Sequence, residues 1–308
     1  MPGAYAHLTL VNALSETQRL EAIPRFQVEA ITSVLDHFKF CELGAVSPDY
    51  PYLAVTDADS TEWADLMHYI RTGEMIHVGI SKLKALNGET KHKCLAWLLG
   101  YAAHVATDVT IHPVIELKVG PYAQNKTRHR VCEMHQDAHI FQRMDLGGVG
   151  ISEHLESGIW ACSQKNTDLL DTDISSLWAS MLKAVHPERF KSNQPNINKW
   201  HQSFNLMVNK IGEEGNKLMP IARHVAVNCG LTYPEINEID EQYTKGLKVP
   251  GGNMDYDQIF DKAVSNVSNV WGLIVRGVFT DSIDYQSKIG NWNLDTGRDG
   301  DGKLAFWN

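Results

Sequence analysis

An otherwise apolar stretch of the sequence carries three polar side chains at intervals of four residues. In "GYAAHVATDVTIHP" (residues 100–113) these are His104, Asp108 and His112. Residues four apart lie on one face of a helix, so the pattern predicts a polar stripe on a buried helix. A buried carboxylate beside two imidazoles needs compensation, which a divalent cation such as zinc provides. Core polar groups satisfied by neighbouring residues are the alternative. We expect Pro113 to end the helix at His112.

A second segment, "KTRHRVCEMHQDAHIF", repeats the spacing. His129, Glu133 and Asp137 share one helix face, and His135 and His139 point roughly to the other side. Alone, this segment is equally compatible with a charged, solvated helix. Together the two segments place six potential ligands within 34 residues, which favours a metal site. Asp137 is a candidate partner that orients a ligating imidazole, or else a plain surface carboxylate.

Three further residues upstream are weaker candidates. Asp49 lies between two prolines in "SPDYPY", where a rigid turn could hold its carboxylate in one geometry. His68 follows an amphipathic stretch in "EWADLMHYIRTGE", and His7 lies near the amino terminus in "AYAHLTL". Taken alone, Asp49 is better explained as a plain turn residue, and His68 and His7 are each weak candidates.

The ordered series of these residues resembles the zinc-dependent phospholipase C family, whose superfamily also includes single-strand-specific nucleases. The resemblance covers roughly residues 4–145. It is carried by His7, Asp49, His68, His104-x3-Asp108-x3-His112-Pro and His129-x3-Glu133. It implies an all-α fold, a compact multi-helix bundle with zinc ions at the bottom of a cleft.

The resemblance also implies an allocation of zinc ligands and a cofactor of two or three Zn²⁺ ions. One site would use Asp49, His68, His104 and Asp108, and a second would use His112, His129 and Glu133. Asp108 would bridge towards a third ion, which His7 would help to bind. In the secreted phospholipases of the family the mature amino-terminal residue binds that third ion, whereas His7 here lies six residues after Met1. The Asp108–His112 spacing is shorter than in those enzymes, and the Asp49–His68 spacing is longer.

The function implied is zinc-dependent phosphodiester hydrolysis of the phospholipase C type. Zinc lowers the pKa of bound water and neutralises charge that develops on phosphorus. Asp49 is the candidate catalytic residue, orienting or deprotonating the attacking water. A nuclease or small-metabolite hydrolase of the same superfamily, or a non-catalytic metal-binding protein, are the alternatives.

The expected partner is a phospholipid or other phosphoester, with transient contact to a membrane surface. A net charge of −9 argues against a stable nucleic-acid partner. The start of the sequence has no evident signal peptide, and no uninterrupted apolar run reaches the ~20 residues that span a bilayer. Five widely spaced cysteines without a CxxC motif favour reduced thiols. We therefore expect a cytoplasmic protein, with secretion as the alternative.

Helical periodicity dominates the chain, and strand-like alternation is nearly absent. A single domain over residues 1–308 is expected, its last ~25 residues forming a loop and tail. Pro24 should interrupt the first predicted helix. The expected helices cover residues 15–38, 61–86, 89–112, 127–145, 166–186, 195–227 and 253–279.

Overall fold

The protein is described by a computed structural model that covers residues 3–54, 58–146, 158–204, 206 and 232–307. Over these residues the chain is predominantly helical, with one antiparallel pair of three-residue strands, so the all-α prediction is confirmed. The elements in chain order are α1 Ala4–Ser15, α2 Thr17–Ala22, α3 Val28–Asp36, α4 Phe38–Val46, η1 Ser47–Leu53, α5 Ala58–Tyr69, α6 Thr72–Lys84, α7 Gly88–Val119, α8 Tyr122–Phe141, η2 Gln142–Met144, η3 Trp160–Cys162, α10 Thr172–Val185, α11 Pro187–Ser192, η4 Ile236–Glu238, η5 Glu241–Tyr243, β1 Leu247–Val249, β2 Gly252–Met254, α14 Tyr256–Phe279 and α15 Tyr285–Lys288.

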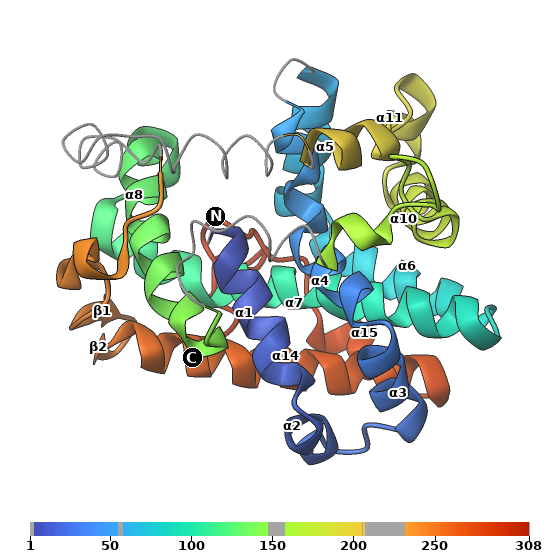
Figure 1. Cartoon of the computed structure of the whole chain (residues 1–308), viewed down its shortest axis with the longest axis horizontal. Helices are drawn as coiled ribbons and strands as arrows, with labels where there is room; N and C mark the ends of the chain where they lie inside the picture. Colours follow the sequence, from blue (N-terminus) through green and yellow to red (C-terminus); the bar gives the residue numbers. More distant parts are fainter. Residues whose placement is uncertain (1–2, 55–57, 147–157, 205, 207–231, 308) are drawn as a thin grey trace.

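The long helix α7 forms the centre of the core. Figure 1 shows it crossing the middle of the molecule, with α14 running beside it. The Trp271 indole of α14 donates to the carbonyl of Leu99 over 2.8 Å. By length and composition α7 is apolar enough to cross a membrane, but its most apolar window is entirely buried within the structure. Full burial against other helices is typical of a core helix.

Two glycines let α4 and α7 approach to backbone contact. A Cβ atom at Gly44 would lie 2.1 Å from the carbonyl oxygen of Trp97, and one at Gly100 would lie 1.9 Å from that of Cys41. No side chain fits at either position, because both neighbours are backbone atoms of packed helices. The close approach brings the carbonyl of Ala45 at the end of α4 within 2.8 Å of His104 Nδ1.

Gly100→Ala should therefore destabilise the protein, although alanine normally favours a helix. The added Cβ forces α4 away from α7, at a cost of about 1–3 kcal/mol of unfolding free energy. Gly79→Ala on α6 is the matched control, because the atoms nearest to its Cβ would be side-chain atoms of Leu98 and Met181, which can move. Chemical denaturation of the two variants measures the difference. Equal losses in both would contradict the role of the backbone contact.

Several helix boundaries differ from those expected. Pro24 interrupts the first predicted helix, as expected, between α2 and α3. The expectation that Pro113 ends its helix is wrong, since α7 continues to Val119. Proline removes one helical hydrogen bond, and the burial of this part of α7 outweighs that loss. The helix expected over 61–86 is divided by Arg71, which has a left-handed φ of 57°. Residues 207–231 of the helix expected over 195–227 lie outside the described residues.

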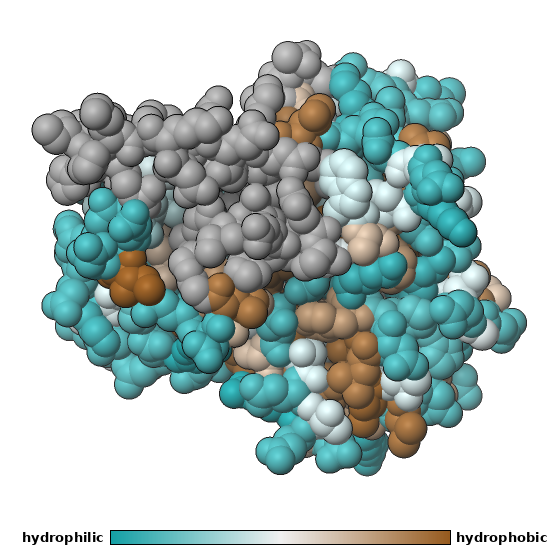
Figure 2. All heavy atoms as spheres, viewed as in Figure 1, coloured by the Kyte–Doolittle hydropathy of each residue, from teal (hydrophilic) through white to brown (hydrophobic). Residues whose placement is uncertain are grey.

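The surface shown in Figure 2 is mostly hydrophilic, with a hydrophobic patch near α3. Two apolar side chains of α3, Val28 and Leu35, are exposed.

The four cysteines among the described residues (Cys41, Cys94, Cys132 and Cys162) are free thiols and buried.

Candidate metal centre

The eight candidate ligands come from five elements that meet around α7. The middle of α7 supplies three of them, and α8, α5, η1 and α1 supply the others. Seven are buried, while the Asp49 side chain is 19% exposed and is the most open of the eight. In chain order the ligand candidates are His7 on α1, Asp49 on η1, His68 on α5, His104, Asp108 and His112 on α7, and His129 and Glu133 on α8.

The tightest group surrounds Asp108. Its Oδ1 lies 3.2 Å from His7 Nε2, and its Oδ2 lies 3.2 Å from His104 Nε2. Two ligand atoms about 2.1 Å from a tetrahedral zinc ion are about 3.4 Å apart, so these separations suit such an ion. The rings of His7 and His104 stack with centroids 4.1 Å apart, which places both imidazoles on the same carboxylate.

A second group shares His104 with the first. Asp49 Oδ1 lies 3.2 Å from His68 Nε2 and 3.8 Å from His104 Nε2. In each of these two groups the potential ligand atoms lie within 4.8 Å of one another. His104 Nε2 can bind only one ion, but because it lies beside both groups, their two ion positions would be neighbours, as in the two-metal sites that act on phosphate esters.

A third group is wider. Glu133 Oε1 lies 4.0 Å from both His112 Nε2 and His129 Nδ1. His129 and Glu133 are one turn apart on α8, whereas His112 faces them from α7. The structure thus brings together the three residues that the family resemblance assigns to the second zinc site.

Nine polar atoms of these groups are buried without a hydrogen-bond partner within the described part of the chain. Both oxygens of Asp108, Oδ1 of Asp49 and both ring nitrogens of His7 are buried without one. The same holds for Nε2 of His68, His104 and His112 and for Nδ1 of His129. A buried polar group that stays unsatisfied costs about 1–3 kcal/mol. Imidazole nitrogens and carboxylate oxygens converging at zinc-ligand spacing fit a cation that would satisfy them.

Comparison with models of known protein families matches residues 6–188 to "zinc dependent phospholipase C". The chain belongs to the zinc-dependent phospholipase C family. All eight candidate ligands lie within the matched residues, and the family is all-α, in agreement with the fold. No match was found among curated proteins or among solved structures.

Backbone carbonyls fix the ring orientation of four of the five histidines in this family member. His68 Nδ1 donates to Ala64 over 2.8 Å, and His104 Nδ1 donates to Ala45 over 2.8 Å. His112 Nδ1 donates to Leu294 over 2.5 Å, and His129 Nε2 donates to Gly120 over 2.6 Å. A carbonyl only accepts, so in the neutral form of each ring the opposite nitrogen is the unprotonated one that can bind a metal. These acceptors could not be found from the sequence, because any residue supplies a carbonyl.

The carboxylates control the protonation of the central histidine. Burial works against a charged His104, but Asp108 and Asp49 outweigh it and raise its pKa to about 9. Burial also works against ionisation of Asp108, whereas His104 and His112 hold the pKa of Asp108 well below its usual range. Burial lowers the pKa of His7. Without a metal, His104 therefore carries the proton that a cation must displace.

Zinc affinity should consequently increase with pH. Below about pH 9 the zinc-free protein holds a proton on His104, and zinc binding releases it. We expect the affinity to rise about tenfold per pH unit between pH 6 and 8 for this one proton. Competition with a chromophoric chelator measures the slope, and calorimetry in buffers of different ionisation enthalpy counts the protons. An affinity independent of pH over this range would contradict the assignment.

Asp137 belongs to α8, and its carboxylate contacts the first residues of α1. Its Oδ1 accepts from the backbone nitrogen of Ala6 over 2.9 Å, and its Oδ2 accepts from that of Tyr5 over 3.3 Å and from the Tyr233 hydroxyl over 3.1 Å. The Asp137 carboxylate fits here because residue 3 is glycine: a Cβ at Gly3 would lie 1.8 Å from Oδ2. Burial raises the pKa of Asp137 to about 7. In this arrangement the carboxylate caps the helix that carries His7, instead of receiving a proton from a ligating ring.

The remaining histidines of α8 face other partners. His135 Nδ1 accepts from the backbone nitrogen of Asp240 over 3.1 Å, and His139 pairs with Asp257 over 2.8 Å.

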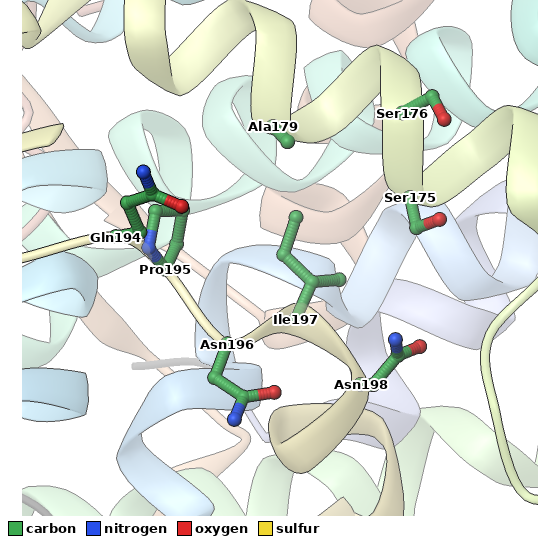
Figure 3. A pocket seen from close by; sticks show the side chains of 8 residues that line it. All are labelled: Ser175, Ser176, Ala179, Gln194, Pro195, Asn196, Ile197 and Asn198. Atoms are coloured by element: carbon green, nitrogen blue, oxygen red, sulfur yellow. The ribbon is translucent and has the colours of Figure 1, made fainter.

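A separate shallow groove of about 460 Å³ lies between α10 and residues 194–198. Figure 3 shows serine and amide side chains around Ile197 there. No histidine, cysteine or carboxylate lines this groove, so it offers no metal ligand of these kinds.

Proposed function

We propose that the protein is a zinc-dependent phosphodiester hydrolase of the phospholipase C type. The observation that carries the proposal is the buried group around Asp108, whose unpartnered oxygens and ring nitrogens converge at zinc-ligand spacing. Family membership supports the same chemistry. When bound, zinc would supply an acidified water and positive charge beside the phosphate.

Different residues of the chain would bind the different zinc ions. His7, His104 and Asp108 would hold one ion, and Asp49 and His68 would hold a neighbouring one. His112, His129 and Glu133 would hold another. Asp108 is wholly buried, which leaves it a ligand without access to substrate.

Asp49 is the residue best placed to act on water. It is the most open of the eight candidates, so a water at the metal centre could reach it. Burial opposes its ionisation, but His104 and His68 lower its pKa, which keeps the carboxylate ready to accept a proton. A general base needs both this protonation state and this access.

The test combines metal analysis with a substrate panel. The purified protein is assayed for zinc and for hydrolysis of bis(p-nitrophenyl) phosphate, phosphatidylcholine vesicles and single-stranded DNA, before and after chelation. We expect bound zinc, chelator-sensitive hydrolysis of a phosphodiester, and preference for the lipid over DNA. Activity that survives both exhaustive chelation and His104→Ala would overturn the proposal. Preference for DNA would assign the nuclease alternative.

A further inference from the structure

The chain beyond the family match contributes directly to the metal centre. Residues 291–307, which we call the clasp, follow α15 and lie well outside residues 6–188. The clasp is irregular in structure, yet it contacts three of the helices around the candidate ligands. Its contacts fall into two sets, one towards α5 and α6 and the other towards α7.

The first set ties the clasp to α5 and α6. Asn291 Oδ1 accepts from the backbone nitrogens of Gly73 and Glu74 over 3.1 Å each, at the start of α6. The Thr72 hydroxyl donates to the Trp292 carbonyl and accepts from the Trp292 nitrogen, both over 2.8 Å. The backbone nitrogen of Leu294 donates to the carbonyl of His68 over 2.9 Å.

The second set ties the clasp to the ligand-bearing part of α7. The Leu294 carbonyl accepts from His112 Nδ1 over 2.5 Å, and the Trp307 indole donates to the Thr110 carbonyl over 2.8 Å. Gly297 lies against α7 with a left-handed φ of 65°. A Cβ there would lie 2.5 Å from both Pro113 Cγ and the Val109 carbonyl oxygen.

The clasp is also braced internally around Leu294. Asn293 Oδ1 accepts from the backbone nitrogens of Asp295 and Thr296, and the Asp295 carboxylate accepts from the Tyr69 hydroxyl over 2.9 Å. Leu294 itself is fully buried. A backbone carbonyl held from both sides in this way can position a ring nitrogen accurately.

We propose that the clasp is the positioning element for His112. Its Leu294 carbonyl holds the proton on Nδ1 and aims Nε2 at Glu133 and His129, so the ion position among these three residues depends on a segment outside the family match. This inference rests on the proposed zinc centre but not on any hydrolytic activity. Disturbing the clasp should weaken one ion selectively, while the His7–His104–Asp108 group keeps its own.

Gly297→Val tests the proposal, with Gly300→Val as the matched control. The first places side-chain atoms against α7 at a left-handed φ, whereas a Cβ at Gly300 would meet nothing within 4 Å. We expect Gly297→Val to lower the affinity for one zinc ion about 10–100-fold, measured by chelator competition. Long-range ¹H–¹⁵N spectra of the zinc-free protein should show His112 losing its Nδ1–H form. Gly300→Val should change neither property.

Thr72→Val is the second variant, in case Gly297→Val does not fold. It keeps the side-chain volume but removes both hydrogen bonds to Trp292, and a smaller loss of the same ion is expected. A folded variant of either kind that retains wild-type zinc affinity and the His112 tautomer would overturn the proposal. Zinc affinity and tautomer are measured without substrate, so a protein that binds zinc normally but hydrolyses no phosphodiester would refute only the proposed function.

Discussion

Asp108→Asn should release zinc from the tightest ligand group and lower phosphodiester hydrolysis at least ~10³-fold. The carboxylate faces His7 with one oxygen and His104 with the other, both at 3.2 Å. An amide keeps the shape but removes the negative charge and replaces one oxygen with a group that cannot bind a cation. Zinc measured by elemental analysis should fall with activity, because the same atoms serve both.

Asp257→Asn is the control for this prediction. It removes the same charge from a carboxylate of α14 that pairs with His139 of α8 and Arg143 of η2. We expect unchanged zinc content and activity in this variant. If Asp108→Asn kept full zinc content and full activity while folded, Asp108 would be a buried polar residue of the core and not a ligand.

Asp49→Asn should lower hydrolysis ~10²–10⁴-fold while leaving most of the bound zinc in place. Asp49 is the most open candidate, and its carboxylate is the one that a bound water could reach. The His7, His104 and Asp108 group does not include Asp49, so the ion held there should remain. The expected signature is a large fall in kcat with a zinc content reduced by at most about one ion per chain.

Asp59→Asn, at an exposed position on α5, provides the comparison and should behave as wild type.

The role of Asp49 as general base also predicts how kcat depends on pH. Loss of the base should remove the acidic limb of the kcat profile, which reports protonation of Asp49 in the wild-type enzyme. If the Asp49→Asn enzyme kept the wild-type kcat and the same acidic limb, a residue other than Asp49 would be the general base.

The sequence indicates which candidate residues lie together better than it indicates where the supporting helices begin and end. The spacing of His104, Asp108 and His112 defines one helix face whatever surrounds it, so periodicity alone predicts this stripe of candidate ligands. The same logic holds for His129 and Glu133. Their convergence with His7 and Asp49 depends on contacts between distant segments, which spacing cannot reveal; the family resemblance supplied that expectation.

Other features depended on tertiary packing. Pro113 was expected to end a helix that in fact continues to Val119, because burial of α7 outweighs one missing hydrogen bond. The helix α1 was not expected, although it carries His7. The backbone carbonyls of Ala45 and Leu294 orient His104 and His112. Any residue type has such a carbonyl, so the sequence does not reveal these contacts. Gly44 and Gly100 are meaningful only once their helices are seen in contact.

The most direct test is a crystal structure of the zinc-loaded protein with diffraction recorded on both sides of the zinc absorption edge. We predict two or three anomalous peaks, one of them shared by His7, His104 and Asp108 and another beside Asp49 and His68. Absence of any zinc peak at Asp108 in a protein that actively hydrolyses a phosphodiester would contradict the account.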